Sequence, residues 1–310
     1  MISSMIQIPL YQAYLEEQGN LAPRTLMLYV RVASQFLKTT PQLDDPESYI
    51  QFLIDTAKRK RNTANFYALK SFIGYYITNT QLKNLIIERM KQLNIKQQDP
   101  IHYLDKKPLN TNELNSILVK FSKYKDYVIS LLMIETGMRI GDVMKIVKDA
   151  IYYESEQDTQ VLKIRYFGKG NKSTIKWIWN LAVAGVIVDY MNKHDSNTEF
   201  IFVDQLHPRQ NRMDTPINIA KVQDTNRKYF WDDLKMTLRI CNIDPSRFSC
   251  HSFRRDYARK MYNWCKDIDS LKKLMGHSRI ETTARYLQQE GYDVKDITKD
   301  FYFKDNIINT

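Results

Sequence analysis

Six side chains in five short motifs have the types and the order needed for chemistry on a phosphodiester. They are Arg139 in Thr-Gly-Met-Arg, Lys169 in Gly-Lys-Gly, His251 and Arg254 in His-Ser-Phe-Arg, His277 after a glycine, and Tyr286. An arginine fork binds two phosphate oxygens at once and stays charged. A phenol becomes a nucleophile when a neighbouring group takes its proton. The set therefore indicates a phosphodiester that is held by two arginines and attacked by a phenolic oxygen, as in DNA strand cutting and rejoining.

Each of these residues, taken alone, also fits an ordinary structural explanation. Arg139 follows a buried apolar helix, where a salt bridge to Asp142 or Glu135 would satisfy its charge. Lys169 stands at the tip of a turn, where lysines are usually solvated, and His277 follows the end of a short helix. The ordered set, and not any single residue, favours the catalytic interpretation.

The spacing of His251 and Arg254 places both side chains on one face of a helix that begins at Ser249 or His251. The core face of this helix consists of large apolar and aromatic side chains at helical spacing, Phe253, Tyr257 and Met261. We therefore expect His251 and Arg254 at the border of the core, where both can reach the same ligand.

The bulk composition favours a folded protein with a polyanionic partner. The net charge is +11 over 310 residues, and 43% of the residues are hydrophobic. The three cysteines form no CxxC pair, which argues against a disulfide framework or a zinc site. The longest apolar run, Tyr127 to Met138, is too short to cross a bilayer. Because the first ten residues also lack the basic start of a signal peptide, we expect a soluble, cytoplasmic, DNA-associated protein.

The first hundred residues have the apolar spacing of a bundle of four or five helices. The predicted helical segments are 10–18, 23–37, one that starts at Asp45-Pro46, 62–76 and 82–93. The stretch 94–110 is polar, contains Pro100 and Pro108 and shows no apolar period, which is typical of a linker. We expect an N-terminal domain over 1–98, a linker over 99–110, and a C-terminal domain with a tail over 111–310.

The C-terminal domain is predicted to be mainly α with a small antiparallel sheet. Helices are expected over 111–121, capped by Asn110 or Thr111, and over the buried segment 125–138. Two strands, 161–167 and 173–179, flank the tight turn 168–172, and 200–203 is a candidate for one more short strand. The remaining residues between 181 and 289 have helical spacing.

The ordered motifs resemble those of the tyrosine recombinase (phage integrase, Xer-type) family. The resemblance covers about residues 105–290, including the interval of nine residues between His277 and Tyr286. It extends more loosely to the segment 22–29, which resembles the first helix of the family's SAM-like core-binding domain. The resemblance implies this two-domain architecture and an enzyme that cuts and rejoins DNA at specific sites.

The resemblance also implies a role for each motif. Tyr286 would attack the scissile phosphate to give a 3′-phosphotyrosyl link and a free 5′ hydroxyl, in a reaction that passes through a Holliday junction. Arg139 and Arg254 would clamp the phosphate oxygens. Lys169 would protonate the leaving 5′ oxygen, and His251 would assist proton transfer at the tyrosine.

Two further positions complete the implied site. His277 would hydrogen-bond a non-bridging oxygen, and Asp142 occupies a position that is usually acidic in the family, where glutamate is more frequent. Because Arg255 directly follows Arg254, the assignment of the second arginine rests on its spacing from His251. The resemblance implies no metal and no other cofactor, since the phosphotyrosine stores the energy of the broken bond.

The expected partner is double-stranded DNA with inverted-repeat target sites, bound by a homotetramer on paired sites that is monomeric when free. The basic run Lys58, Arg59, Lys60 and Arg61, together with Lys172, is predicted to contact DNA. Lys163, Arg165 and Lys176 add charge near the predicted hairpin. The tail 293–310 carries apolar residues that would pack on a neighbouring protomer or on its own domain. The alternatives are a type IB topoisomerase and a non-catalytic DNA-binding protein on the same fold.

Overall fold

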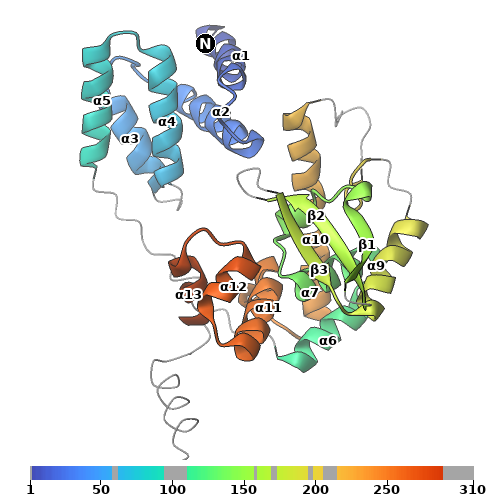
Figure 1. Ribbon diagram of the computed structural model, residues 1–310. Coiled ribbons are helices and arrows are strands. Elements are labelled where there is room, and N and C mark those ends of the chain that lie inside the picture. Colours follow the sequence, from blue (N-terminus) through green and yellow to red (C-terminus); the bar gives the residue numbers. More distant parts are fainter. Residues whose placement is uncertain are drawn as a thin grey trace, which may run out of the picture. The chain divides into compact units, whose positions relative to one another are not determined.

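The computed structural model describes residues 2–57, 62–93, 110–156, 159–168, 173–194, 198–204 and 215–288. Within these ranges, side chains are described except at 2–7, 57, 62, 156, 285, 286 and 288. The described residues form two compact units (Figure 1). One contains α1–α5 and the first residues of α10, up to Ala220, and the other contains the remaining elements from α6 to α13. The predicted domain bounds 1–98, 99–110 and 111–310 stay a prediction, because the predicted linker lies almost entirely outside the described residues.

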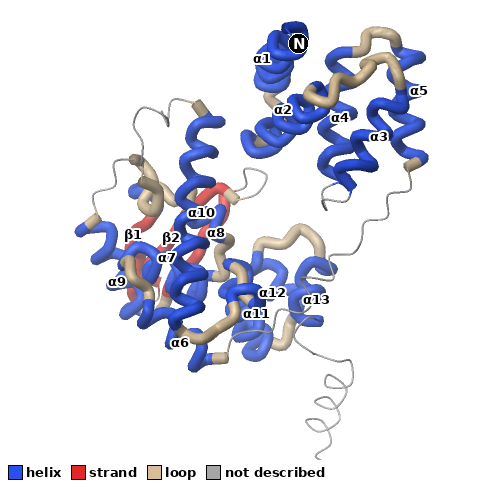
Figure 2. Tube along the Cα trace, turned by 180° about the vertical axis from the view of Figure 1, so that it is seen from behind, coloured by secondary structure: helices blue, strands red, loops and turns tan. Residues whose placement is uncertain are grey.

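The first unit is a bundle of helices around an aromatic core. Its helices are α1 (Ile2–Glu17), α2 (Pro23–Leu37), α3 (Pro46–Ala57), α4 (Asn62–Tyr76) and α5 (Thr80–Gln92). Helices α2 and α4 lie side by side (Figure 2). The rings of Tyr11, Phe36, Tyr49 and Phe72 are fully buried. The predicted bounds of α2 and α4 are confirmed, whereas α1 starts earlier than expected, with Pro9 inside the helix.

The second unit is mainly helical with one small sheet, as the sequence predicted. Its helices and strands are α6 (Thr111–Lys120), α7 (Tyr124–Thr136), α8 (Ile140–Val143), β1 (Ile151–Glu156), β2 (Thr159–Phe167), β3 (Ser173–Ile178), α9 (Leu181–Lys193), α10 (Pro216–Ile240), α11 (Cys250–Cys265), α12 (Ile268–Met275) and α13 (Ile280–Gln288). Asn110 and Glu113 cap α6 reciprocally, as expected. Helices α11, α12 and α13 contact one another, and α11 also packs on α7 (Figure 1).

The sheet has the antiparallel order β1-β2-β3, with α7 and α9 packed against it. Strand β1 was not predicted from the sequence, because its second half, Glu154 to Glu156, is polar and gives little strand signal. The prediction of a short strand over 200–203 is wrong. There, Thr198 Oγ1 donates to the carbonyls of Phe200 and Val203, which curls the segment into a turn, and a lone bridge joins Phe200 to Val147.

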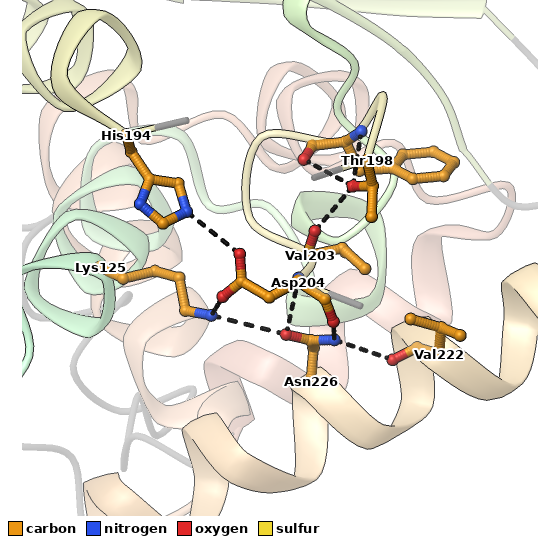
Figure 3. Close-up of polar contacts among 8 residues, drawn as sticks. Lys125, His194, Thr198, Val203, Asp204, Val222 and Asn226 are labelled. Atoms are coloured by element: carbon orange, nitrogen blue, oxygen red, sulfur yellow. Dashed lines mark hydrogen bonds and ion pairs between the residues drawn. The ribbon is translucent and has the colours of Figure 1, made fainter. Parts of the chain in front are cut away.

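A polar network joins that turn to Lys125 of α7, to His194 directly after α9, and to Asn226 of α10 (Figure 3). Asp204 Oδ2 lies 2.6 Å from Lys125 Nζ, and Asp204 Oδ1 lies 3.1 Å from His194 Nε2. Asn226 on α10 exchanges two hydrogen bonds with the backbone of Asp204, at 3.1 and 2.8 Å. The network satisfies groups that the turn buries, and so it holds the start of α7 in place. None of the helices in the described residues combines the length and apolar character needed to span a membrane.

Asp126 in the first turn of α7 is a buried carboxyl that meets a second carboxyl, Asp233 on α10. Burial, a hydrogen bond to Asp233 and the charge of Asp233 raise the pKa of Asp126 well above its usual range. The folded state therefore keeps a proton that the unfolded state releases near pH 4. The free energy of unfolding should thus fall as the pH rises from about 4 toward neutrality. Asp126→Asn should make the free energy of unfolding, measured in urea across that pH range, less dependent on pH. An unchanged pH dependence would contradict the proton that Asp126 keeps in the folded state.

Candidate active site

A glycine turn at the end of α7 places Arg139. Gly137 ends α7 in the left-handed region (φ 65°), and its N–H donates to Met133 O at 3.0 Å. A Cβ built on Gly137 would lie 2.3 Å from Cδ1 of Tyr257, which is packed against it from α11. The chain then turns so that Arg139 becomes the residue before α8, with Asp142 in the next turn. Glycine is therefore required here by the backbone and by the close ring.

Gly137→Ala should disrupt this corner. The left-handed backbone and the overlap with Tyr257 together should cost about 2–4 kcal/mol of unfolding free energy. Gly276→Ala is the matched control, because Gly276 has φ 61° but no atom lies within 4 Å of its built Cβ. That variant should lose only about 1 kcal/mol in the same urea titration. Equal losses in the two variants would show that the contact with Tyr257 has no effect.

Arg254 of α11 lies deeper than the sequence analysis expected. It is 1% exposed, and its guanidinium donates to the carbonyls of Gly137 and Met275. Its Nη2 also lies 3.1 Å from Nε2 of His277. These acceptors explain why a charged side chain is buried instead of standing at the border of the core. Arg255 is also buried, but its Nη2 binds Ser252 Oγ at 2.8 Å. The spacing from His251 thus identified the arginine that lies beside His277.

The hydrogen bonds of His277 fix its tautomer. A guanidinium only donates, so Nε2 of His277 must be the acceptor toward Arg254. The remaining proton is then on Nδ1, which donates to Thr283 Oγ1 at 3.0 Å. Burial and the charges of Arg254, Arg139 and Lys176 lower the pKa of His277 to about 4. The imidazole is therefore neutral at physiological pH and serves to orient Arg254.

Thr283 was not singled out from the sequence, although it lies in α13 one turn before Tyr286 and is fully buried. Thr283→Val keeps the shape but removes the acceptor for Nδ1–H of His277. The tautomer should become mixed, and stability should fall by about 1–3 kcal/mol. Imidazole ¹⁵N shifts and urea unfolding would measure the two effects. Thr282→Val, at an exposed position next to it, should leave both unchanged, and Thr283→Ser should restore the tautomer.

The surroundings of the two arginines are rich in positive charge. Arg139 Nη1 lies 3.8 Å from Asp142 Oδ2, and the Arg139 side chain remains 34% exposed. This long, partly solvated ion pair leaves Arg139 accessible to an anion. His251 is exposed at the start of α11. The partial burial of its ring lowers its pKa most, and the positive charges of Arg254 and Arg139 lower the pKa further. His251 is thus a neutral group beside two cations, suited to accept a proton.

Several predicted residues cannot be placed. Lys169, Lys172, the basic run 58–61 and the tail 293–310 lie outside the described residues. The backbone of Tyr286 belongs to α13, while its side chain is not described. Arg139, Asp142, His251, Arg254 and His277 do come together around the ends of α7 and α12. Their functional roles stay a prediction. Thr283 was not predicted from the sequence, and Lys176, which was counted among the charges near the hairpin, is buried.

Comparison with known proteins identifies the domain. A model of the phage integrase family matches residues 107–291. Tyrosine recombinase XerC of Caldanaerobacter subterraneus subsp. tengcongensis is 27% identical over 79% of this chain, which spans 64% of that relative's length. Tyrosine recombinase XerD of Listeria innocua is 23% identical over 93% of this chain and 96% of its own.

The fold agrees with this match. A lambda integrase tetramer bound to a Holliday junction superposes with a TM-score of 0.59 at 13% identity, covering 94% of this chain and 78% of that one. At this identity the likeness concerns the fold. The family model covers more than half of the chain and includes all the motifs from Arg139 to Tyr286. The chain therefore belongs to the phage integrase family of tyrosine recombinases.

Proposed function

We propose that this protein is a site-specific DNA recombinase that cuts and rejoins DNA through a covalent 3′-phosphotyrosine. The observation that carries the proposal is the placement of Arg254. This buried guanidinium joins the ends of α7 and α12 and lies beside His277, in a domain that matches the phage integrase family. Arg139 and His251 are its electrostatic neighbours. Such an array of fixed donors stabilises the charge that develops on a phosphate under attack.

In the proposed reaction the Tyr286 oxygen forms a bond to the scissile phosphorus, and the bond from phosphorus to the 5′ oxygen breaks. His251 assists removal of the phenolic proton, as its lowered pKa allows. Lys169 supplies a proton to the leaving 5′ oxygen. Strand exchange reverses the same steps with a different 5′ hydroxyl, so neither metal nor nucleotide enters the balance.

Arg139 and Arg254 hold the non-bridging oxygens, and Asp142 orients Arg139 from 3.8 Å. The proposed contact of His277 with a phosphate oxygen requires a proton on Nε2, which in the structure accepts from Arg254. A bound phosphate favours that change, because negative charge nearby raises the pKa of an imidazole. His277 then passes from orienting Arg254 to donating a hydrogen bond itself.

The proposed partner is double-stranded DNA carrying inverted-repeat sites. The segment 1–98 would be a DNA-binding domain joined by the linker 99–110 to the catalytic domain 111–310. Lys58, Arg59, Lys60, Arg61 and Lys172 would contact phosphates, which makes binding salt-dependent. By analogy with the lambda integrase tetramer on a Holliday junction, we propose that four copies assemble on paired sites.

The test is to trap covalent protein–DNA adducts in the host cell and to sequence the attachment points. Attachment at one or two discrete inverted repeats is the expected result and would give the target. Attachment dispersed over the genome would instead favour DNA relaxation by a topoisomerase-like reaction. A complete lack of adducts would refute the cleavage function and leave a DNA-binding role.

A further inference from the structure

Lys176 interrupts the apolar inner face of the sheet. On β3 it is paired with Ile164 of β2, and the next inward position is the buried Ile178. Since side chains alternate along a strand, an apolar residue is expected at this position. Lys176 is instead a lysine with only 6% of its surface exposed. Lys163 lies on the opposite face of the same sheet and forms an ion pair with Glu154 at 2.9 Å.

The ammonium group of Lys176 reaches the end of α12. It donates to the carbonyl of Leu274, and Nζ lies 5.8 Å from the ring centroid of Tyr257. Among the ion pairs within the described residues, Lys176 takes part in none. Burying an ammonium group without a carboxylate is costly. A lysine at this buried position therefore calls for a role that an apolar side chain does not fill.

That carbonyl belongs to the last turn of the helix that leads to His277. Lys176 binds the carbonyl of Leu274, and Arg254 binds the next one, Met275. Both carbonyls lie at the carboxyl end of α12, where the helix dipole favours cations. The chain continues through Gly276 (φ 61°) to His277, whose N–H returns to Lys272 O at 3.0 Å. Two basic side chains from different elements therefore hold the segment that positions His277.

The charged groups that act on Lys176 are Arg254 of α11, Arg139 directly before α8, and Asp142 of α8. Burial and the charges of Arg254 and Arg139 lower the pKa of Lys176 to about 7, while Asp142 opposes this shift. Lys176 in turn helps to lower the pKa of His277. The same three charges act on Tyr166 of β2. Burial and the charge of Asp142 raise the pKa of Tyr166, and the charges of Arg254 and Arg139 oppose this rise. An anion on the arginines would reverse the balance and favour the charged amine.

We propose that Lys176 is a positioning residue for strand cutting, whose ammonium group holds the carboxyl end of α12, and with it His277, against the sheet when a phosphate binds Arg139 and Arg254. This inference rests on the proposed function for the identity of the anion. It assigns Lys176 a task distinct from the proton donation proposed for Lys169. Binding of the anion charges the amine, and the charged amine tightens the site around the anion.

The first test needs no target DNA. In protein with ¹³C-labelled lysines, the resonance of Lys176 is assigned by its loss in Lys176→Arg and titrated with and without sulfate, which does not itself titrate near neutral pH. We expect the Lys176 pKa to rise when sulfate binds, and we expect weaker sulfate binding by Lys176→Met. A Lys176 resonance that does not respond to saturating sulfate would overturn the proposal.

The second test compares folding with reaction. Lys176→Met replaces a buried charge with an apolar group of similar shape, so the thermal midpoint should be unchanged or higher. Adduct formation on the mapped target should nevertheless slow by about 10- to 100-fold at neutral pH. Lys176→Arg should recover part of the rate, and Lys163→Met should keep it, since Lys163 lies on the other face.

The outcomes separate the two proposals. If Lys176→Met reacts within about twofold of the wild-type rate, the effect on the barrier is much smaller than the expected 10-fold loss requires. That result would refute the positioning role and leave the strand-cutting proposal intact. A parallel loss of rate and thermal stability, without rescue by arginine, would also refute it, because it would indicate an ordinary packing residue. A wild-type protein that forms no adduct would refute strand cutting, while the sulfate titration would still decide whether Lys176 responds to an anion.

Discussion

Tyr286→Phe is expected to abolish covalent attachment to DNA while leaving DNA affinity unchanged. The substitution removes one hydroxyl and keeps the ring, so binding contacts made by the rest of the protein persist. Without the phenolic oxygen, no bond to phosphorus forms, and the loss should be complete and not partial. The measurement is adduct yield on denaturing gels, together with binding by gel shift at one fixed salt concentration.

Tyr229→Phe provides the control for this experiment, because Tyr229 is an exposed tyrosine on α10, remote in sequence from the motifs. It should form adducts at the wild-type level. Residual adduct in Tyr286→Phe would remove Tyr286 as the nucleophile and direct the search to another hydroxyl. Loss of DNA binding in the same variant would show that the hydroxyl contributes to DNA affinity as well as to attachment.

Arg254→Ala should slow adduct formation by about 10²- to 10³-fold, the usual effect of losing one preorganised donor to a developing charge. It should also destabilise the fold, because the carbonyls of Gly137 and Met275 lose a buried donor. Single-turnover adduct kinetics at saturating protein would separate the rate effect from weaker binding. Urea unfolding would give the stability loss.

Two companion variants make the assignment of Arg254 specific. Arg254→Lys keeps the charge but lacks the fork that reaches two carbonyls and His277, so it should rescue little of the rate. Arg255→Ala removes the neighbouring buried arginine, which binds Ser252, and should affect stability more than rate. If Arg255→Ala formed adducts more slowly than Arg254→Ala, the phosphate-binding arginine would be Arg255 and not Arg254.

The sequence predicted helices well where local signals mark their ends. Pro23 at the start of α2, Gly276 after α12 and the Asn110–Glu113 box of α6 act within a few residues, and those ends were confirmed or nearly so. It failed for β1 and for 200–203, where pairing with a distant strand or a threonine side chain decides the backbone. Local propensity does not contain that information.

The site shows the same division. The ordered motifs and their resemblance to a known family selected Arg139, His251, Arg254 and His277. The structure brings these residues together, although their catalytic roles stay predictions. The sequence could not indicate how deeply each side chain is buried. The burial of Arg254 depends on carbonyls from two other elements, and the contact between Thr283 and His277 depends on how α13 packs. Lys176 looks like any strand lysine until the register shows which face it occupies.

The guanidinium of Arg254 has a consequence for the order in which the protein is made. It bonds Gly137, 117 residues earlier in the chain, and Met275, 21 residues later. Contacts of such long range form after local helices during folding. A chain still emerging from the ribosome therefore has α7 and its glycine turn before Arg254 can bond both Gly137 and Met275. Assembly of the proposed cutting site therefore waits for the last helices, and an unfinished chain is expected to lack the complete site.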